Sequence, residues 1–168
     1  MVATFNGNEA IALMLLQKGA NPSYTDATGY TPLHWAAFNG FAEATRELLA
    51  RRVWVDAANR YGWTPLLQAA SRGHVAVVRQ LIAAGASVNV ADQEGWTPLH
   101  KVVANRHGEV MRELLMAGAN PAAEHQSGQT PMSIALAHGD AESYRLLDIF
   151  RRNPVKGSMT ADGSINFS

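Results

Sequence analysis

Histidine side chains are the first candidates for chemistry in this sequence, because imidazole binds metal ions and transfers protons. The chain has 168 residues with six histidines and no cysteine, so thiolate ligands and a cysteine nucleophile are absent. Four histidines recur at two repeated positions: His34 with His100, and His74 with His107. Histidines spaced along a repetitive chain do not converge on one point, so we predict structural roles, no metal ion and no cofactor. His125 and His138 are isolated, and we expect them to be surface groups.

Carboxylates four residues apart are the second candidates, as an acid and base pair: Glu43 with Glu47, and Glu109 with Glu113. An arginine lies within each pair, and further arginines recur at the same phase, so a solvated helix face explains them. The sequence has no serine, histidine and acid arrangement and no glycine-rich phosphate loop. We therefore predict that the chain is not an enzyme.

Charge and hydropathy narrow the class of partner and the compartment. Fourteen Lys and Arg balance fourteen Asp and Glu, so no field draws in a nucleic acid or an anionic membrane. The longest apolar run, at 10–16, is too short to span a bilayer, and no basic region precedes it. The absence of cysteine fits a reducing compartment. We expect an intracellular protein, in the cytoplasm or nucleus, that does not insert into membranes.

The elements that position these residues follow from an internal repeat. The pattern Gly, any residue, Thr, Pro begins at four glycines with a constant spacing of 33 residues: Gly29, Gly62, Gly95 and Gly128. Thr64 can cap a helix that begins at Pro65, where a missing amide hydrogen costs nothing. Leu66, Ala69 and Ala70 then fall on one face of a short inner helix.

A second helix follows in the same unit. Gly73 is suited to end the first helix in the left-handed conformation, and His74 begins a second helix with an apolar stripe over 75–82. Gly85 ends this helix, and the segment 87–95 is rich in turn-forming residues. Such short helices are marginal alone, so each pair must pack on its neighbours in an elongated stack.

These residues resemble the ankyrin repeat family over about residues 3–152, or about four and a half repeats. The resemblance rests on Thr31 to Ala37, Thr97 to His100, and Gly85 to Asn89. It implies an all-α solenoid of helix-turn-helix units with projecting β-turn loops, a concave groove and, in most members, protein binding. It also implies that His34 and His100 bond to nearby loops. We expect a partial repeat at 1–25, repeats at 26–58, 59–91 and 92–124, and a capping repeat at 125–152.

The pattern changes at both ends of the array. The first unit lacks a Thr-Pro turn, so it is either an unusual cap or, as we favour, the remainder of a longer array. In the last unit, Asp148 replaces an apolar residue and 151–152 reads Arg-Arg, which predicts a polar outer face. Residues 153–168 are predicted to be a flexible tail or linker, with a junction at 157–158, or, as a weaker alternative, to dock Ile165 and Phe167 into a groove.

One internal break lies in the second unit, where Arg52-Val53 replaces Gly-Ala and Trp54 follows. We predict a left-handed Arg52 with a strain of roughly 1 kcal/mol. The break is either a tolerated variation or a patch adapted to a partner.

Binding residues are predicted on the concave side, where one aromatic follows each repeated glycine and variable residues occupy the turn tips and helix ends. The candidates are Tyr30, Phe38, Arg60, Tyr61, Trp63, Arg72, Gln93, Glu94, Trp96 and Asn105. Alternatively, the rings pack on their neighbours. We predict a protein-binding scaffold or adaptor, monomeric on its own. The open alternatives are a regulatory or targeting segment of a larger enzyme, channel or transcription regulator, and a structural spacer or self-associating array.

Overall fold

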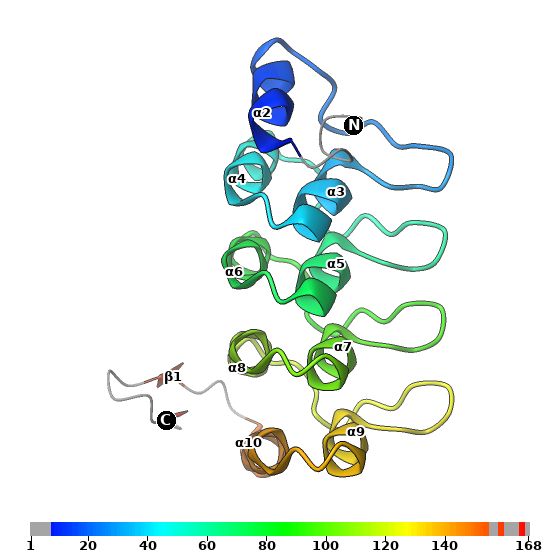
Figure 1. Ribbon diagram of the computed structural model, residues 1–168, viewed down its shortest axis with the longest axis vertical. Helices are drawn as coiled ribbons and strands as arrows, with labels where there is room; N and C mark the ends of the chain where they lie inside the picture. The colour runs from blue at the N-terminus through cyan, green and yellow to red at the C-terminus, as the bar shows by residue number, and fades with distance from the viewer. Residues whose placement is uncertain (1–7, 155–157, 160–164, 167–168) are drawn as a thin grey trace.

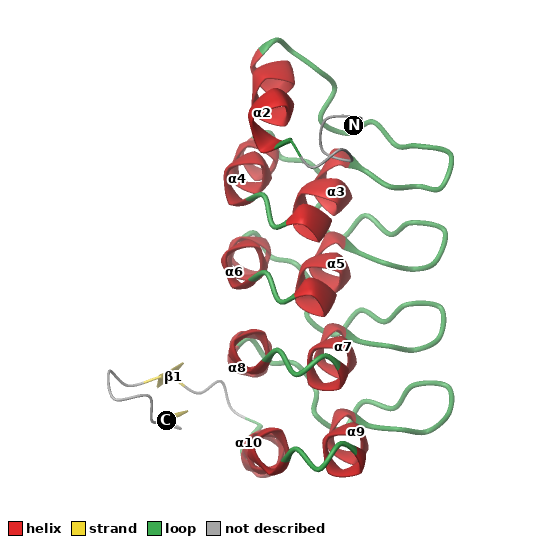
Figure 2. Ribbon diagram, viewed as in Figure 1, coloured by secondary structure: helices red, strands yellow, loops and turns green. Residues whose placement is uncertain are grey.

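A computed structural model of the chain describes residues 8–154 and two short strands at 158–159 and 165–166. Nine helices lie in this part, stacked in two columns with loops projecting from one side (Figures 1 and 2). The first column contains α3 (Pro32–Asn39), α5 (Pro65–Arg72), α7 (Pro98–Ala104) and α9 (Pro131–Ala137). The second contains α2 (Glu9–Gln17), α4 (Ala42–Ala50), α6 (Val75–Ala83), α8 (Gly108–Met116) and α10 (Ala141–Arg152). The predicted all-α solenoid is confirmed.

Each helix of the first column begins with the predicted threonine cap. The Thr64 hydroxyl accepts a hydrogen bond from Leu67 N at 3.3 Å, and the extended backbone of Thr64 leads into Pro65. The other three first helices begin in the same way, at Thr31, Thr97 and Thr130. The proline motif therefore sets where every inner helix starts.

The link between the two helices of a unit requires a residue with positive φ and close contact with the next unit. Gly40 and Gly73 have φ of 73° and 77°, and a β-carbon on either would lie 2.6–2.7 Å from a histidine ring of the following repeat. Those rings belong to His74 and His107. Arg106, with φ of 59°, replaces glycine in the third link, which the sequence analysis did not anticipate.

The core is a continuous line of apolar side chains between the columns, as the repeat predicts. The first column contributes fully buried leucines at Leu33, Leu66 and Leu99, and the second contributes Leu48, Leu81, Leu114 and Leu147. Small residues such as Ala36 and Ala69 are completely buried between successive first helices, which lets these helices approach closely. Stability therefore comes mainly from contacts between repeats.

The projecting turns are joined by backbone hydrogen bonds from one repeat to the next. The amides of Arg60, Gln93 and Gln126 donate to carbonyls of the preceding turn at 3.0, 3.1 and 3.1 Å. Each bond links residues 32 positions apart, so the turns form a ladder along the same side of the molecule (Figure 1).

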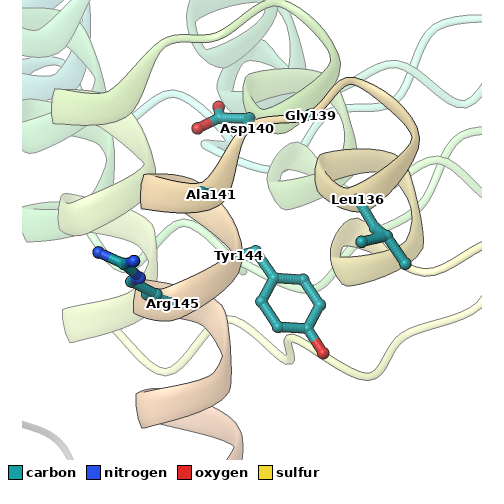
Figure 3. A pocket seen from close by; sticks show the side chains of 6 residues that line it. All are labelled: Leu136, Gly139, Asp140, Ala141, Tyr144 and Arg145. Atoms are coloured by element: carbon teal, nitrogen blue, oxygen red, sulfur yellow. The ribbon is translucent and has the colours of Figure 1, made fainter.

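The last repeat is only partly polar on its outer side. Asp148 pairs with Arg151 at 2.6 Å and Arg152 at 2.8 Å, as the polar replacement suggested. However, Leu136 is 69% exposed and Tyr144 is 37% exposed, and with Ala141 they line a hollow of about 200 Å³ (Figure 3). The prediction of a polar outer face is therefore wrong for this part, because earlier repeats bury the same positions under the next unit.

The helical part of the chain ends with α10, at Arg152, directly before Asn153 and Pro154. In the tail, β1 (Ser158–Met159) pairs antiparallel with β2 (Ile165–Asn166). Most of the predicted linker, including Gly157 and Phe167, lies outside the described residues.

Candidate functional site

The side that we predict to be concave is built on the projecting turns, and each turn is closed by the side chain of its first residue. Asp92 Oδ1 accepts hydrogen bonds from Glu94 N at 3.0 Å and Trp96 N at 2.9 Å. Asn59 accepts from Tyr61 N and Trp63 N in the same way, at 2.9 and 3.0 Å. These bonds fix the backbone of each turn and so set where its aromatic ring lies.

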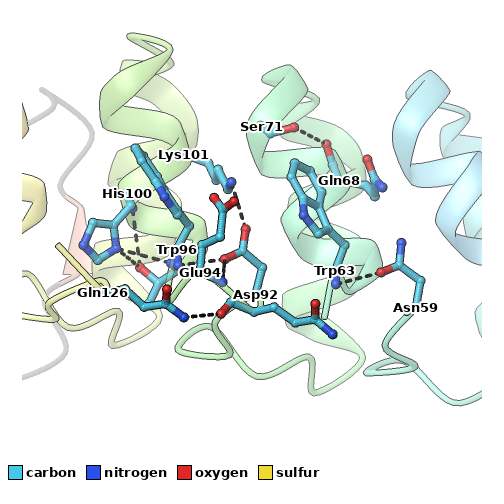
Figure 4. A network of polar contacts seen from close by, with 12 residues as sticks. Asn59, Trp63, Gln68, Ser71, Asp92, Glu94, Trp96, His100, Lys101 and Gln126 are labelled. Atoms are coloured by element: carbon cyan, nitrogen blue, oxygen red, sulfur yellow. Dashed lines mark hydrogen bonds and ion pairs between the residues drawn. The ribbon is translucent and has the colours of Figure 1, made fainter. Parts of the chain in front are cut away.

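Lys101 of α7 lies between two rings of the predicted aromatic row (Figure 4). Its amine is 4.5 Å from the ring centroid of Trp63 and 4.8 Å from that of Trp96, and it forms an ion pair with Asp92 at 2.9 Å. The side chain of Lys101 is 15% exposed and that of Asp92 only 3%. A shielded cation between two aromatic faces is attracted by both rings, so Lys101 holds the two turns together.

Trp96 also stacks on His125, with ring centroids 4.7 Å apart and an interplanar angle of 12°. His125 is only 8% exposed, so the prediction of a surface group is wrong for this histidine. The physical reason is its position as the first residue of the fourth turn, where Nδ1 accepts from Ser127 N as the Asp92 carboxylate does in its own turn. His138 is exposed, as predicted.

The N-terminal end of the row contains a second aromatic cluster. Tyr30 stacks on Trp35 with centroids 4.8 Å apart, and Gln68 donates to its hydroxyl at 3.3 Å. Phe38 contacts Trp35 edge to face, and the guanidinium of Arg72 lies 4.1 Å from the Phe38 ring centroid. Tyr30, Phe38 and Arg72 are therefore brought together on one surface.

The turn-tip candidates remain exposed but are tied to one another. Arg60 donates to Ala27 O at 2.7 Å, and Gln93 Nε2 donates to Arg60 O at 2.6 Å. Tyr61, 50% exposed, lines a hollow of about 260 Å³ together with Trp63, Gln93, Glu94 and residues beneath them. The tips thus present a partly rigid surface with charged and aromatic groups.

A second hollow, of about 400 Å³, lies among the ends of the first helices. Phe38, Ser71 and Arg72 form part of its wall, and Asn105 nearby donates to Ser71 O at 2.8 Å. Six of the ten candidate residues therefore line one of the two hollows: Phe38, Tyr61, Trp63, Arg72, Gln93 and Glu94.

The motif histidines are buried and link neighbouring repeats. His34 Nδ1 accepts from Thr31 N at 3.1 Å, while its Nε2 donates to Trp63 O at 2.9 Å. His100 makes the equivalent bonds to Thr97 N and to Gln129 O, the latter at 3.1 Å. Burial lowers the pKa of both imidazoles, because a desolvated imidazolium is unfavourable. The predicted bonds to nearby loops are confirmed.

Two further residues of this surface were not predicted from the sequence. Lys101 and Trp35 occupy the same repeat position on the first helices, directly after the motif histidine. Their variation between repeats was a usable signal, because core positions of the repeat stay apolar. The partnership of Lys101 with Asp92 was not readable, since it joins a helix to a turn nine residues earlier.

Within residues 8–154 and the two strands, no three His, Asp or Glu side chains gather closely enough to hold a metal ion. No described helix has both the length and the apolar character needed to cross a membrane. A family model for ankyrin repeats in three copies matches residues 1–92 and, in a second match, residues 68–148.

Proposed function

Because the chain belongs to the ankyrin repeat family, whose repeats are generally protein–protein interaction modules, we propose that it holds a protein or peptide partner along its concave side. The candidate contacts are Tyr30, Phe38, Arg60, Tyr61, Trp63, Arg72, Gln93, Glu94, Trp96 and Asn105. In this proposal the chain acts as an intracellular scaffold or adaptor without catalysis or a cofactor.

The observation that carries this proposal is the grouping of exposed Tyr61, Arg60 and Glu94 around partly buried tryptophans. Aromatic and arginine side chains on a preorganised surface are typical anchors of protein interfaces. The ladder between turns supports the same role, because a partner loses less free energy when the surface is already ordered. Trp96 is the less accessible anchor, since Lys101 and His125 both contact its ring.

The test is capture of cell proteins on the immobilised chain, followed by mass spectrometry. A Trp63→Ala/Trp96→Ala variant should lose the specific partner, and each single change should cost roughly 1 to 3 kcal/mol of binding free energy. Thermal unfolding of each variant is measured in parallel. Arg112→Ala is the control, because its ion pair with Glu142 lies on the second column.

Unfolding of the tryptophan variants at the assay temperature would favour a packing role for the rings. In that event, Tyr61→Ala provides the decisive comparison, since Tyr61 is half exposed. Unchanged capture by a folded Tyr61→Ala and Arg72→Gln double variant would contradict the concave site.

A further inference from the structure

A second exposed surface lies at the end of α4, in the column away from the projecting turns (Figure 1). We define the Trp54 patch as Lys18, Arg51, Arg52 and Trp54. Trp54 is 73% exposed, and Arg51, Arg52 and Lys18, the last at the Arg51 position of the preceding repeat, are exposed as well. An indole this accessible leaves most of its apolar area in water, which is unfavourable for the isolated chain.

The patch depends on a strained backbone. Arg52 has a φ of 56°, where Gly19, Gly85 and Gly118 stand at the same position of other repeats. The left-handed conformation disfavours side chains with a β-carbon, so the predicted strain at Arg52 is confirmed in its geometry. The loop is the same as in other repeats, but here it bears Arg, Val and Trp.

Arg52 and Arg106 share the left-handed conformation but differ in their side-chain hydrogen bonds. Arg106 also has positive φ, at 59°, but its side chain donates to His138 O at 3.1 Å. The side chain of Arg52 is exposed and forms no hydrogen bond or ion pair with any described residue, whereas its backbone amide donates to Leu49 O at 2.9 Å. Strain that gains no internal contact indicates a function outside the fold.

The charge of the patch comes from two neighbouring repeats. Lys18 and Arg51 are the C-terminal caps of α2 and α4, which pack against each other, and they occupy the same repeat position. A cation is favoured at a helix C-terminus, yet the C-caps of α6 and α8 are Ala84 and Ala117. The helix ends therefore do not require these cations.

The acidic groups close to the patch are few. Asp56 accepts hydrogen bonds from Ser87 N at 3.1 Å through both carboxylate oxygens, so it serves the loop of the next repeat. Glu47 lies one turn before Arg51 on α4 and is partly buried. No ion pair joins either carboxylate to Lys18, Arg51 or Arg52 among the residues described.

We propose that the Trp54 patch is a second docking surface, which binds an acidic protein segment with an apolar side chain against Trp54. The arginines and Lys18 attract the carboxylates and raise the association rate, while the indole provides the buried anchor. This surface lies outside the concave site, so a partner that contacts both is held at two points.

The probe is a fluorescent peptide in which single leucines alternate with pairs of glutamates. Its binding to the chain is measured by fluorescence anisotropy. Its reference is the same peptide with lysine in place of glutamate, and vesicles rich in phosphatidylserine test for a membrane partner. Trp54→Ser introduces the residue found at this position in the next repeat, so the fold should tolerate it. Arg51→Ala likewise reproduces the cap of α6.

We expect the glutamate peptide to bind in preference to the lysine peptide, and binding to weaken as salt is raised. Trp54→Ser should weaken binding by about tenfold with an unchanged melting temperature. Arg52→Gly should weaken binding while it raises the melting temperature. Tyr144→Ala, at an exposed aromatic of the last repeat, is the matched control and should leave peptide binding unchanged.

Wild-type affinity in Trp54→Ser overturns the proposal, as does equal binding of the lysine peptide. If the chain binds the vesicles but not the glutamate peptide, the partner of the patch is a membrane surface. That result also overturns the proposal. Capture through Trp63 and Trp96 does not involve this patch, so the two proposals fail independently.

Discussion

A histidine at the third residue of a first-column helix serves two purposes. It caps the start of that helix, and it forms a hydrogen bond to the next repeat. In His34, Nδ1 accepts from Thr31 N while Nε2 donates to Trp63 O, so only the neutral ring with hydrogen on Nε2 satisfies both. Protonation places a hydrogen on Nδ1, opposite the Thr31 amide. The bonds and the burial therefore both favour the neutral form.

Stability should for this reason fall on mild acidification. The folded pKa of His34 and His100 is lowered below the unfolded value of about 6.5, so the unfolded chain binds protons first as pH drops. The contribution of the neutral rings is complete above about pH 6.5 and is lost as pH falls from there through the folded pKa. Urea unfolding between pH 8 and pH 5 measures this slope.

The repeat at 59–91 provides the control, because Leu67 occupies the histidine position there. A His34→Leu/His100→Leu variant should be less stable at neutral pH, since it loses the bonds to Trp63 O and Gln129 O. Its stability should also change less between pH 6.5 and 5. A slope equal to that of the wild type would assign the pH dependence to other groups.

At the scale of single elements, two glycines with the same backbone conformation differ in their surroundings. Gly62 and Gly85 have φ of 76° and 90°, but a β-carbon on Gly62 would lie 2.9 Å from Gln93 N, whereas Gly85 has open space. Gly85→Ala should cost about 1 kcal/mol from the backbone alone. Gly62→Ala should cost about 1 to 3 kcal/mol more, because backbone of the next turn must move.

Chemical denaturation of both variants measures this difference. Equal losses would mean that the turns adjust freely to each other, contrary to the ladder described above. The two substitutions are matched in residue type and in sign of φ, so the comparison isolates the contact between turns.

The left-handed arginines make a second matched pair of elements. Arg52→Gly should raise the free energy of unfolding by roughly 0.5 to 1 kcal/mol, since it relieves strain without loss of a side-chain contact. Arg106→Gly should gain less, because it also removes the bond to His138 O. Thermal melts of both variants test this order, and a less stable Arg52→Gly would contradict the strain argument.

Elements were predictable from sequence wherever the cause is local. Thr64 and Pro65 specify a helix start through a cap and a fixed φ, and Gly73 specifies its end. The burial of His125 and the placement of Lys101 between two tryptophans depend on contacts between repeats, which the order of residues within one unit does not reveal. The exposure of Leu136 was missed because its position is buried in every complete neighbour.

At the scale of the whole molecule, stability depends on where a side chain lies along the stack. Leu81 is fully buried between α6 and its neighbours, and Leu81→Ala should cost about 2 to 5 kcal/mol. Leu136→Ala, at 69% exposure, should change stability by less than about 0.5 kcal/mol. Denaturant unfolding followed by circular dichroism distinguishes them, and similar losses at both sites would argue against a core formed between repeats.

The backbone bonds from each turn to the one before it set a fixed pitch for the projecting tips, like the teeth of a comb. A deletion or insertion within a turn would shift every later turn tip relative to a ligand that spans several of them. Changes of chain length within a turn should therefore be tolerated less well than exchanges of the exposed side chains at its tip. Evolution of new binding preferences along this edge is thus expected to proceed by exchange of side chains at constant spacing.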